Sequence, residues 1–383
     1  MKNVKTIIKF FFDISVVLIL FFNLLIKLFN FLNIRKILNC KSIYFFTQGG
    51  FGHQFWILDH ARYLEKKKDV LVILFIDNNR HNKYLTECFD LNFIQFKSCI
   101  NLLNIRFGEY EGNNIIFLIS FLKYLTKNIF RKNILMNNEI YLKLNNKILC
   151  NKFINIERFK KIKSHQAHQK GYYYQLINEK LKSPNLPNNL KNLIENKYKI
   201  LNKENFLICT LYLRNSNNRT DFSAYIRNGN KLEEYVLLIE YLIKNRYNIF
   251  LVGDYNEKYI NFGNFKKNIF THKDFKVKKK IFELFAAFNH HMLISECGGY
   301  HNLGYYSRFA IGVNFFPYGY HPPNYLKILN KKLFKNKNEI LSQEHCENNY
   351  HDVVDENIYK KNNIEIRNNS VEEIIFICKS LIK

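Results

Sequence analysis

The chain has 383 residues, of which 47% are hydrophobic and 23% charged, with only 14 glycines and 5 prolines. These values are ordinary for a globular protein and exclude disorder, collagen and a coiled coil as the main structure. The formal net charge of +26, from 58 Lys and Arg against 32 Asp and Glu, favours an anionic partner, although a Lys- and Asn-rich composition produces the same excess.

The N-terminal segment is the most apolar part of the sequence. Residues 7–32 are rich in Phe, Leu, Ile and Val, but polar residues interrupt them, and the longest apolar run, Ile14–Phe22, is too short to span a bilayer as a helix. On a helix the lysines and other polar residues share one sector, which predicts an amphipathic helix over 1–39 that lies in a membrane surface. A spanning signal-anchor and a helix docked on the protein itself are the alternatives.

Short apolar runs then alternate with helical patterns. Residues 43–48 and 70–77 read as strands, with a glycine turn and a helix over 54–67 between them, and 114–120 is a further candidate strand. Because the strands are apolar on both faces, they predict a parallel sheet covered by helices on both sides. The proline cluster at 183–187 marks a domain boundary, which we place between an N-terminal domain at 40–190 and a C-terminal domain at 191–383.

The same alternation begins again in the C-terminal domain. Strands are expected at 206–214, 248–254, 267–270, 292–296 and 309–316, and helices at 232–243 and 281–288. Ser370 and Glu373 form a capping box at the start of a closing helix. The fold class predicted is therefore α/β, with two Rossmann-like domains in succession.

The eight cysteines form no Cys-x-x-Cys pair, and no His-Glu-x-x-His helix, Walker loop or Asp-x-Asp clamp occurs. Several cysteines lie in apolar runs, which favours buried, reduced thiols in a cytosolic protein. Cys297 has no paired base and is expected to be structural rather than a nucleophile. We expect no cofactor and no bound metal.

The first candidate site is the turn after the first strand, which contains Gly49, Gly50 and Gly52, followed by His53 and Gln54. Glycines at a strand-to-helix turn allow a ligand to approach the backbone closely, and the helix start favours an anion or a polar sugar. A turn required only for tight strand–helix geometry would show the same glycines.

The second candidate is a group of arginines that begins at a strand end. Arg214 ends the strand, and Arg219, Asp221, Arg227 and Asn228 follow in the next loop. The planar guanidinium group matches phosphate oxygens, and fixed cations stabilise the charge that grows on a leaving diphosphate. A surface Arg–Asp network is the structural alternative.

The third candidate is another strand-to-helix turn, in which Ser295, Glu296, Gly298 and Gly299 could cradle phosphate and hold a ribose or sugar hydroxyl. Asp254, at the end of the 248–254 strand, is a lesser candidate for the same site.

These residues resemble two families. Leu213-Arg214, Arg227-Asn228, Tyr235, Gly253-Asp254 and Ser295-x-x-Gly298, within about 205–325, resemble a bacterial family of glycosyltransferases found with surface-polysaccharide genes. The Gly49–Gln54 turn is similar to the Gly-Gly-Leu-Gly-Asn-Gln turn of α-1,2-fucosyltransferases. Both resemblances imply the GT-B fold, in which a nucleotide sugar binds between two Rossmann-like domains, usually without metal. One departure is Tyr212, which stands where the first family has a histidine.

Together, these observations lead us to expect a metal-independent glycosyltransferase of hexosyl or fucosyl type. It would transfer a sugar from a nucleoside-diphosphate donor to a lipid-linked or polysaccharide acceptor at the cytoplasmic face of a membrane. Donor binding is assigned to the second and third candidates and acceptor binding to the first, with His53 or Asp221 as the base. A basic nucleic-acid-binding protein, which no motif supports, and a non-catalytic scaffold on a degenerate transferase fold are the rivals.

Overall fold

The computed structural model divides the chain into two compact units, Met1–Leu181 and Lys182–Lys383. The boundary lies nine residues before the one predicted, so that helix α9 (Asn188–Leu201) belongs to the second unit. The residues described by the structure are 35–36, 38–40, 42–47, 55, 58, 70–76, 84–89, 93–97, 133–136, 184–202, 204–214, 222–255, 262–298, 300, 307, 309–316, 325–350, 353 and 355–382.

The first unit contains a parallel sheet. Its described strands are β1 (Ser42–Thr47), β2 (Val70–Ile76), β3 (Phe93–Lys97) and β4 (Asn133–Met136), in the spatial order β3-β2-β1-β4. Every pairing in this sheet is parallel, which confirms the predicted sheet type and the strands predicted at 43–48 and 70–77. Strands β3 and β4 were not predicted, and the strand expected at 114–120 lies outside the described residues.

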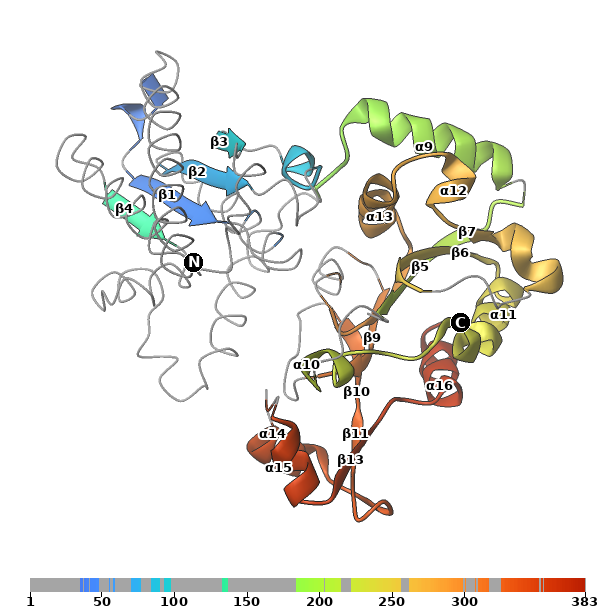
Figure 1. Cartoon of the computed structure of the whole chain (residues 1–383). Helices are drawn as coiled ribbons and strands as arrows, with labels where there is room; N and C mark the ends of the chain where they lie inside the picture. The colour runs from blue at the N-terminus through green and yellow to red at the C-terminus, as the bar shows by residue number, and fades with distance from the viewer. Residues whose placement is uncertain are drawn as a thin grey trace, which may run out of the picture. The chain divides into compact units, whose positions relative to one another are not determined.

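Six described strands form the main sheet of the second unit, all parallel, in the order β10-β9-β8-β5-β6-β7 (Figure 1). They are β5 (Leu207–Arg214), β6 (Tyr247–Asp254), β7 (Ile269–Phe270), β8 (Met292–Glu296), β9 (Phe309–Phe315) and β10 (Tyr325–Asn330). All but β10 were expected from their apolar runs. The α/β class with parallel sheets is thus confirmed.

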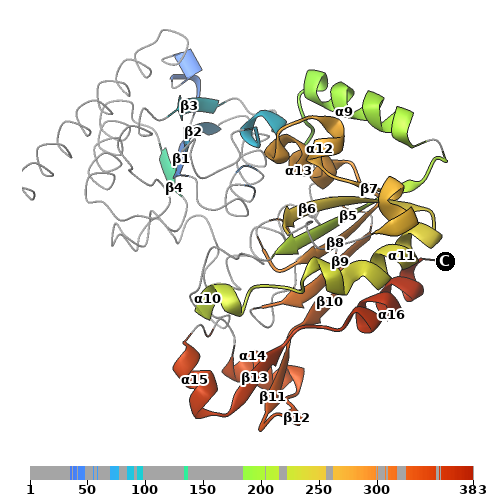
Figure 2. The same cartoon turned by 45° about the vertical axis from the view of Figure 1, so that its right-hand side comes forward.

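Helices cover both faces of this sheet. Figure 2 shows α9, α12 (His272–Phe275) and α13 (Lys279–Phe288) on one side, and α11 (Val236–Lys244) and α16 (Val371–Leu381) on the other. Two 3₁₀ helices precede elements of this unit: η4 (Leu232–Tyr235) leads directly into α11, and η5 (Gly263–Asn268) leads into β7. This two-sided cover explains why the strands are apolar on both faces.

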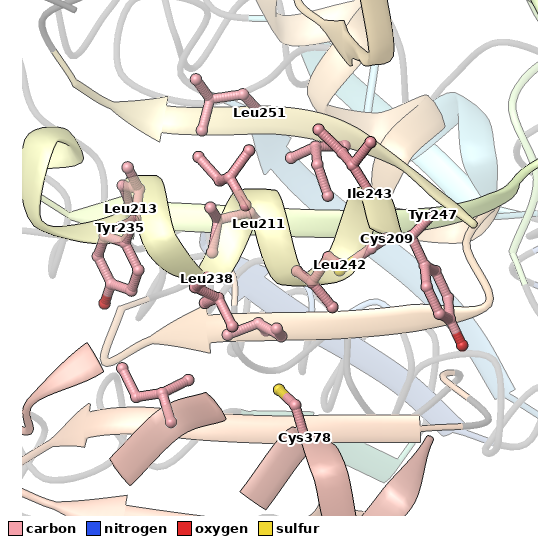
Figure 3. Packing of buried hydrophobic residues seen from close by; sticks show 14 of the residues in the cluster. Cys209, Leu211, Leu213, Tyr235, Leu238, Leu242, Ile243, Tyr247, Leu251 and Cys378 are labelled. Atoms are coloured by element: carbon pink, nitrogen blue, oxygen red, sulfur yellow. The ribbon is translucent and has the colours of Figure 1, made fainter. Parts of the chain in front are cut away.

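The alternation along β5 shows how each face is packed. Cys209, Leu211 and Leu213 are buried against α11 and α16, where Leu238, Leu242 and Cys378 meet them (Figure 3). Thr210 points to the other face and donates a hydrogen bond to the carbonyl oxygen of Ala286 in α13, at 2.9 Å. Aromatic rings fill that second face around Phe250, whose ring centroid lies 5.3 Å from that of Phe282.

A small antiparallel sheet follows β10 and was not predicted. Its strands are β11 (Lys332–Lys335), β12 (Glu339–Ile340) and β13 (Ile364–Arg367), and α14 (Gln343–Asn349) and α15 (Glu356–Lys361) lie beside it (Figure 1). Its strands are short and half exposed, so the sequence lacks the continuous apolar runs that mark the main sheet. Leu333, Tyr350 and Tyr359 form a core with Ile226 and Phe316 of the main sheet's loops.

The structure describes the helix predicted at the C-terminal end of the chain, but little of the one predicted at the N-terminal end. The capping box is confirmed: the Ser370 side chain accepts a hydrogen bond from the backbone of Glu373 at 3.3 Å, and Glu373 accepts one from the backbone of Ser370 at 2.9 Å. Almost all of the helix predicted over 1–39 lies outside the described residues. Among the residues that are described, no helix is long and apolar enough to cross a bilayer.

Candidate functional site

The main sheet of the second unit changes direction at β5. From β5 the chain continues outward to β6 and β7, and then returns to the other side of β5 to form β8, β9 and β10. In open parallel sheets, ligands bind outside the carboxyl ends of the strands at such a switch point. Arg214 and Glu296 end the two strands that flank it, and Lys331 follows the end of β10.

Arg214 crosses the switch point. Its Nη1 donates a hydrogen bond to the carbonyl oxygen of Cys297, the residue after β8, at 2.7 Å. This contact uses one of five guanidinium N–H groups and fixes the direction of the side chain, which is half-buried. A cation held in place at the carboxyl edge of a parallel sheet is suited to bind an anion, and the donor-binding role of Arg214 stays a prediction.

Glu296 lies behind this arginine, with 0% of its surface exposed. Its Oε2 accepts from the backbone N–H of Arg214 at 2.5 Å. Its Oε1 accepts from the backbone N–H of Asn230 at 2.8 Å, from the Tyr235 hydroxyl at 2.7 Å and from Asn314 Nδ2 at 3.3 Å. Burial raises the pKa of this carboxyl to about 7, although these four hydrogen bonds favour the ionised form.

This burial corrects one interpretation. Glu296 was expected to hold a ribose or sugar hydroxyl, but it has no exposed surface and its oxygens already accept bonds from the protein. Ser295, expected in the same cradle, is also 0% exposed, and its hydroxyl donates to the carbonyl oxygen of Glu296 at 3.0 Å. Both side chains hold backbone in place rather than contact a ligand directly.

A turn at 227–230 lies against the buried carboxylate. The Gly229 N–H donates to the carbonyl oxygen of Arg214 at 2.8 Å, which ties the turn to the end of β5. A Cβ on Gly229 would lie only 1.8 Å from the carboxyl carbon of Glu296, so the contact leaves no space for a side chain there. The predicted residues Arg227 and Asn228 lie in this turn, where Arg227 is half-buried.

Lys331 completes the group and was missed by the sequence reasoning. It is 4% exposed, and its Nζ donates to the carbonyl oxygen of Asn228 at 2.5 Å. Burial lowers its pKa to about 8, with Glu296 acting in the opposite direction and Arg214 in the same one. In a lysine-rich sequence, nothing distinguishes Lys331 from the neighbouring Lys332. We refer to Arg214, the 227–230 turn, Glu296, Cys297 and Lys331 as the switch-point site.

The remaining donor-binding predictions have different surroundings. Gly298 packs against Tyr212, because a Cβ there would lie 2.8 Å from the tyrosine hydroxyl oxygen. Tyr212 in turn stacks on Tyr300, with ring centroids 4.7 Å apart. Asp254 is paired with Arg214 in the β5–β6 register, but its exposed carboxylate lies 3.5 Å from Lys279 Nζ. Close packing therefore accounts for the glycine, and an ion pair for the aspartate.

Several predicted residues lie outside the described residues. They are Gly49, Gly50, Gly52, His53 and Gln54 of the first turn, with Arg219, Asp221 and Gly299. Strand β1, which the first turn follows in sequence, lies at the switch point of its own sheet, between β2 and β4. The roles given to these residues stay predictions.

Cysteine and metal chemistry find no support in the described part of the chain. Cys297 is buried, and its thiol donates to the carbonyl oxygen of Phe316 at 2.7 Å, in keeping with the structural role expected. All six described cysteines are buried and unpaired with one another. No group of three or more His, Cys, Asp or Glu side chains there could hold a metal ion.

Comparison with known proteins gave similarities to solved structures alone, because no family model and no curated protein matches the chain. The glycosyl transferase family 9 protein from Veillonella parvula has a TM-score of 0.48 at 12% identity, over 90% of this chain and 98% of its own. The E. coli ADP-heptose lps heptosyltransferase II has a TM-score of 0.39 at 12% identity, over 77% and 92%. NodZ α-1,6-fucosyltransferase, soaked with GDP-fucose, has a TM-score of 0.34 at 9% identity, over 70% and 93%. Since each TM-score is below 0.5, the function must be argued from the site.

Proposed function

We propose that the protein is a glycosyltransferase of GT-B type that takes its sugar from a nucleoside-diphosphate donor, and that the diphosphate binds at the switch-point site. The observation that carries the proposal is the position of Arg214. It ends β5 at the topological switch point, and its guanidinium is already oriented by the bond to Cys297. Nucleotides are common ligands at this place in parallel sheets.

The charge of the site suits a diphosphate leaving group. When the bond between sugar and phosphate breaks, negative charge grows on the diphosphate, and cations fixed in advance stabilise it without reorganisation. Arg214 and Arg227 would supply that charge, with Arg219 in the intervening loop. Lys331 adds a third described cation within electrostatic reach of Arg214. Together these cations would supply the positive charge that a divalent metal provides in other transferases, so that the reaction would need no metal.

The acceptor side of the proposal depends on sequence. An acceptor hydroxyl needs a base within hydrogen-bond reach, and His53 is the first candidate and Asp221 the second. The Gly49–Gln54 turn would hold the acceptor, a lipid-linked glycan or surface polysaccharide. The amphipathic N-terminal helix would hold the enzyme on the cytoplasmic face of the membrane, close to such an acceptor.

A nucleotide-binding assay tests the proposal and separates it from its rivals. We expect UDP, GDP or ADP to raise the melting temperature of the full chain, because a ligand that binds only the folded state stabilises it. The shift should persist in EDTA. Stabilisation by oligonucleotides alone would indicate a nucleic-acid-binding protein, and stabilisation by neither class would indicate a scaffold.

A further inference from the structure

We infer that Glu296 and Lys331 act together as positioning residues, which hold the turn at 227–230 in place against the end of β5. This inference rests on the proposed function, because it assigns the turn to the diphosphate end of that site. Neither side chain is expected to touch the donor. Their role is to fix the backbone that carries Arg214 and Arg227.

Four hydrogen bonds define the arrangement. Lys331 Nζ donates to the carbonyl oxygen of Asn228, and the Asn230 N–H donates to Glu296 Oε1. Between them the Gly229 N–H donates to the carbonyl oxygen of Arg214, and the Arg214 N–H donates to Glu296 Oε2. The turn and the strand end are therefore joined to each other directly and again through one carboxylate.

The absence of a side chain at Gly229 explains how the turn can lie so close to the carboxylate of Glu296. A side chain at this position would overlap the carboxyl group of Glu296, since a Cβ would lie 1.8 Å from its carbon and from one of its oxygens. The absence of a Cβ lets the backbone lie flat against the carboxylate. Contact between the turn and the end of β5 thus requires a glycine at position 229 and a buried hydrogen-bond acceptor, the carboxylate of Glu296.

Burial of the charged forms of Glu296 and Lys331 costs free energy, because burial raises the pKa of Glu296 and lowers that of Lys331. Buried opposite charges rarely stabilise a fold more than well-packed apolar residues would. A pair retained at the carboxyl edge of a sheet is better explained by the geometry it imposes. Glu296 interacts with Arg214, Tyr212, Tyr235 and Lys331, and Lys331 interacts with Glu296, Cys297 and Arg214.

The arrangement is strongest with an ionised Glu296 and a protonated Lys331, because the carboxylate accepts from all of its donors and an ammonium group donates more strongly than a neutral amine. Below about pH 7 the carboxyl gains a proton and can no longer accept from every surrounding donor, and above about pH 8 the lysine loses its charge. We therefore expect the turn to be held best between these values. The affinity for a nucleoside diphosphate should fall on both sides of this range.

Hydrogen exchange on the full chain tests the inference without any ligand. The variants are Lys331→Met and Glu296→Gln, and their matched controls are Lys332→Met and Glu373→Gln, which remove the partners of a nearby half-exposed ion pair. At pH 7.5 we expect exchange in peptides covering 226–230 to be at least about tenfold faster in the first two variants and unchanged in the controls. Exchange equal to wild type in both variants would overturn the inference.

The wild-type protein provides a second test that depends on no substitution. After correction for intrinsic rates, protection of 226–230 should be greater at pH 7.5 than at pH 5.5 or pH 9.5. Protection independent of pH would overturn the inference even if a variant fails to fold.

Measurements of ADP binding distinguish the proposed function from the positioning role inferred for Glu296 and Lys331. ADP affinity should fall as the pH rises from 7.5 to 9.5, and this fall should vanish in Lys331→Met but persist in Lys332→Met. ADP is used for this arm if it binds, since its base does not titrate there. If UDP, GDP and ADP all fail to bind wild type, the proposed function fails, while the exchange data still decide whether the charges hold the turn.

Discussion

The guanidinium group of Arg214 donates a hydrogen bond to the carbonyl oxygen of Cys297, which orients it. If it faces the diphosphate, its contribution is largest as the donor bond breaks, so the loss should appear in turnover as well as in donor binding. Arg214→Ala removes a charge-assisted contact worth about 1.5–3 kcal/mol, which corresponds to a rate loss of about tenfold to a hundredfold. Arg214→Lys should restore only part of it, because an ammonium group lacks the guanidinium's planar fork.

The matched control for this prediction is Arg246→Ala. Arg246 also donates to a backbone carbonyl, that of Glu204 at 3.1 Å, but it immediately precedes β6 at the opposite edge of the sheet. Steady-state kinetics with the nucleotide sugar should separate the two variants. Wild-type kinetics for Arg214→Ala would remove this residue from the site, and unfolding of that variant would indicate a structural role for its bond to Cys297.

At Glu296 the raised pKa makes a prediction about stability. The folded state holds the proton more tightly than the unfolded state, so the stabilisation is complete below pH 4.5 and is lost as the pH rises through about 7. The loss is on the order of 3 kcal/mol for a shift of this size. The ionised carboxylate that the turn requires is therefore maintained at a cost in stability, as is common at functional sites.

Urea unfolding of wild type and Glu296→Gln at pH 5 and pH 8 measures this effect. Titrating groups that do not interact with Glu296 cancel in the comparison. The free energy of unfolding of wild type, minus that of the variant, should therefore be smaller at pH 8 than at pH 5. A difference that is the same at both pH values would show that Glu296 does not titrate in this range.

Among the secondary-structure elements, α16 is the one whose start was predicted and then found with its capping box intact. The Ser370 side chain satisfies a backbone N–H that the first turn of the helix leaves without a partner. Ser370→Ala should lower the free energy of unfolding by about 1 kcal/mol. Ser380→Ala, in the last turn of the same helix, removes an exposed hydroxyl that donates to the carbonyl oxygen of Ile377 and satisfies no backbone N–H, so it should change the free energy of unfolding by less than about 0.5 kcal/mol. Equal losses in denaturant melts would contradict the capping role.

The predicted elements share one property. Strands β5, β6, β8 and β9 and helix α13 are long or strongly apolar, because each lies in a sheet covered on both faces or packs against it. The elements that were missed include β10, β11, β12 and β13 with α14 and α15. They are short or partly exposed, and tertiary contacts such as the packing of Leu333 in one cluster with Ile226, which follows α10 (Phe222–Tyr225), stabilise them.

For the whole molecule, the prediction concerns attachment to membranes. Deletion of residues 1–36 should leave a protein with an unchanged melting transition that no longer pellets with anionic vesicles, because the apolar face and its lysines are then absent. Replacement of Lys2, Lys5 and Lys9 by Gln is the matched control, and should weaken pelleting while the apolar face remains. Unchanged pelleting after the deletion would contradict the anchor, and resistance of the intact chain to an alkaline wash would favour a spanning helix over an in-plane one.

The sequence by itself determined the α/β class, most of the main sheet and the position of Arg214 at a strand end. These follow from local signals. An apolar run indicates a buried strand, and the first charged residue at its end indicates where the strand reaches the carboxyl edge of the sheet. The partner of Arg214 at Cys297 could not be predicted, because the two residues are brought together by the order of strands in the sheet.

Tertiary structure alone decided which charges are buried. In the sequence, Glu296 lies two residues before a pair of glycines and Lys331 lies beside another lysine, and both would pass for solvent-facing residues. Their burial depends on where β8 and β10 end relative to the 227–230 turn, with which Lys331 pairs across 103 residues of chain. Local patterns carry no information about such a distance. The charges that orient the site therefore became visible only once the strands were assembled.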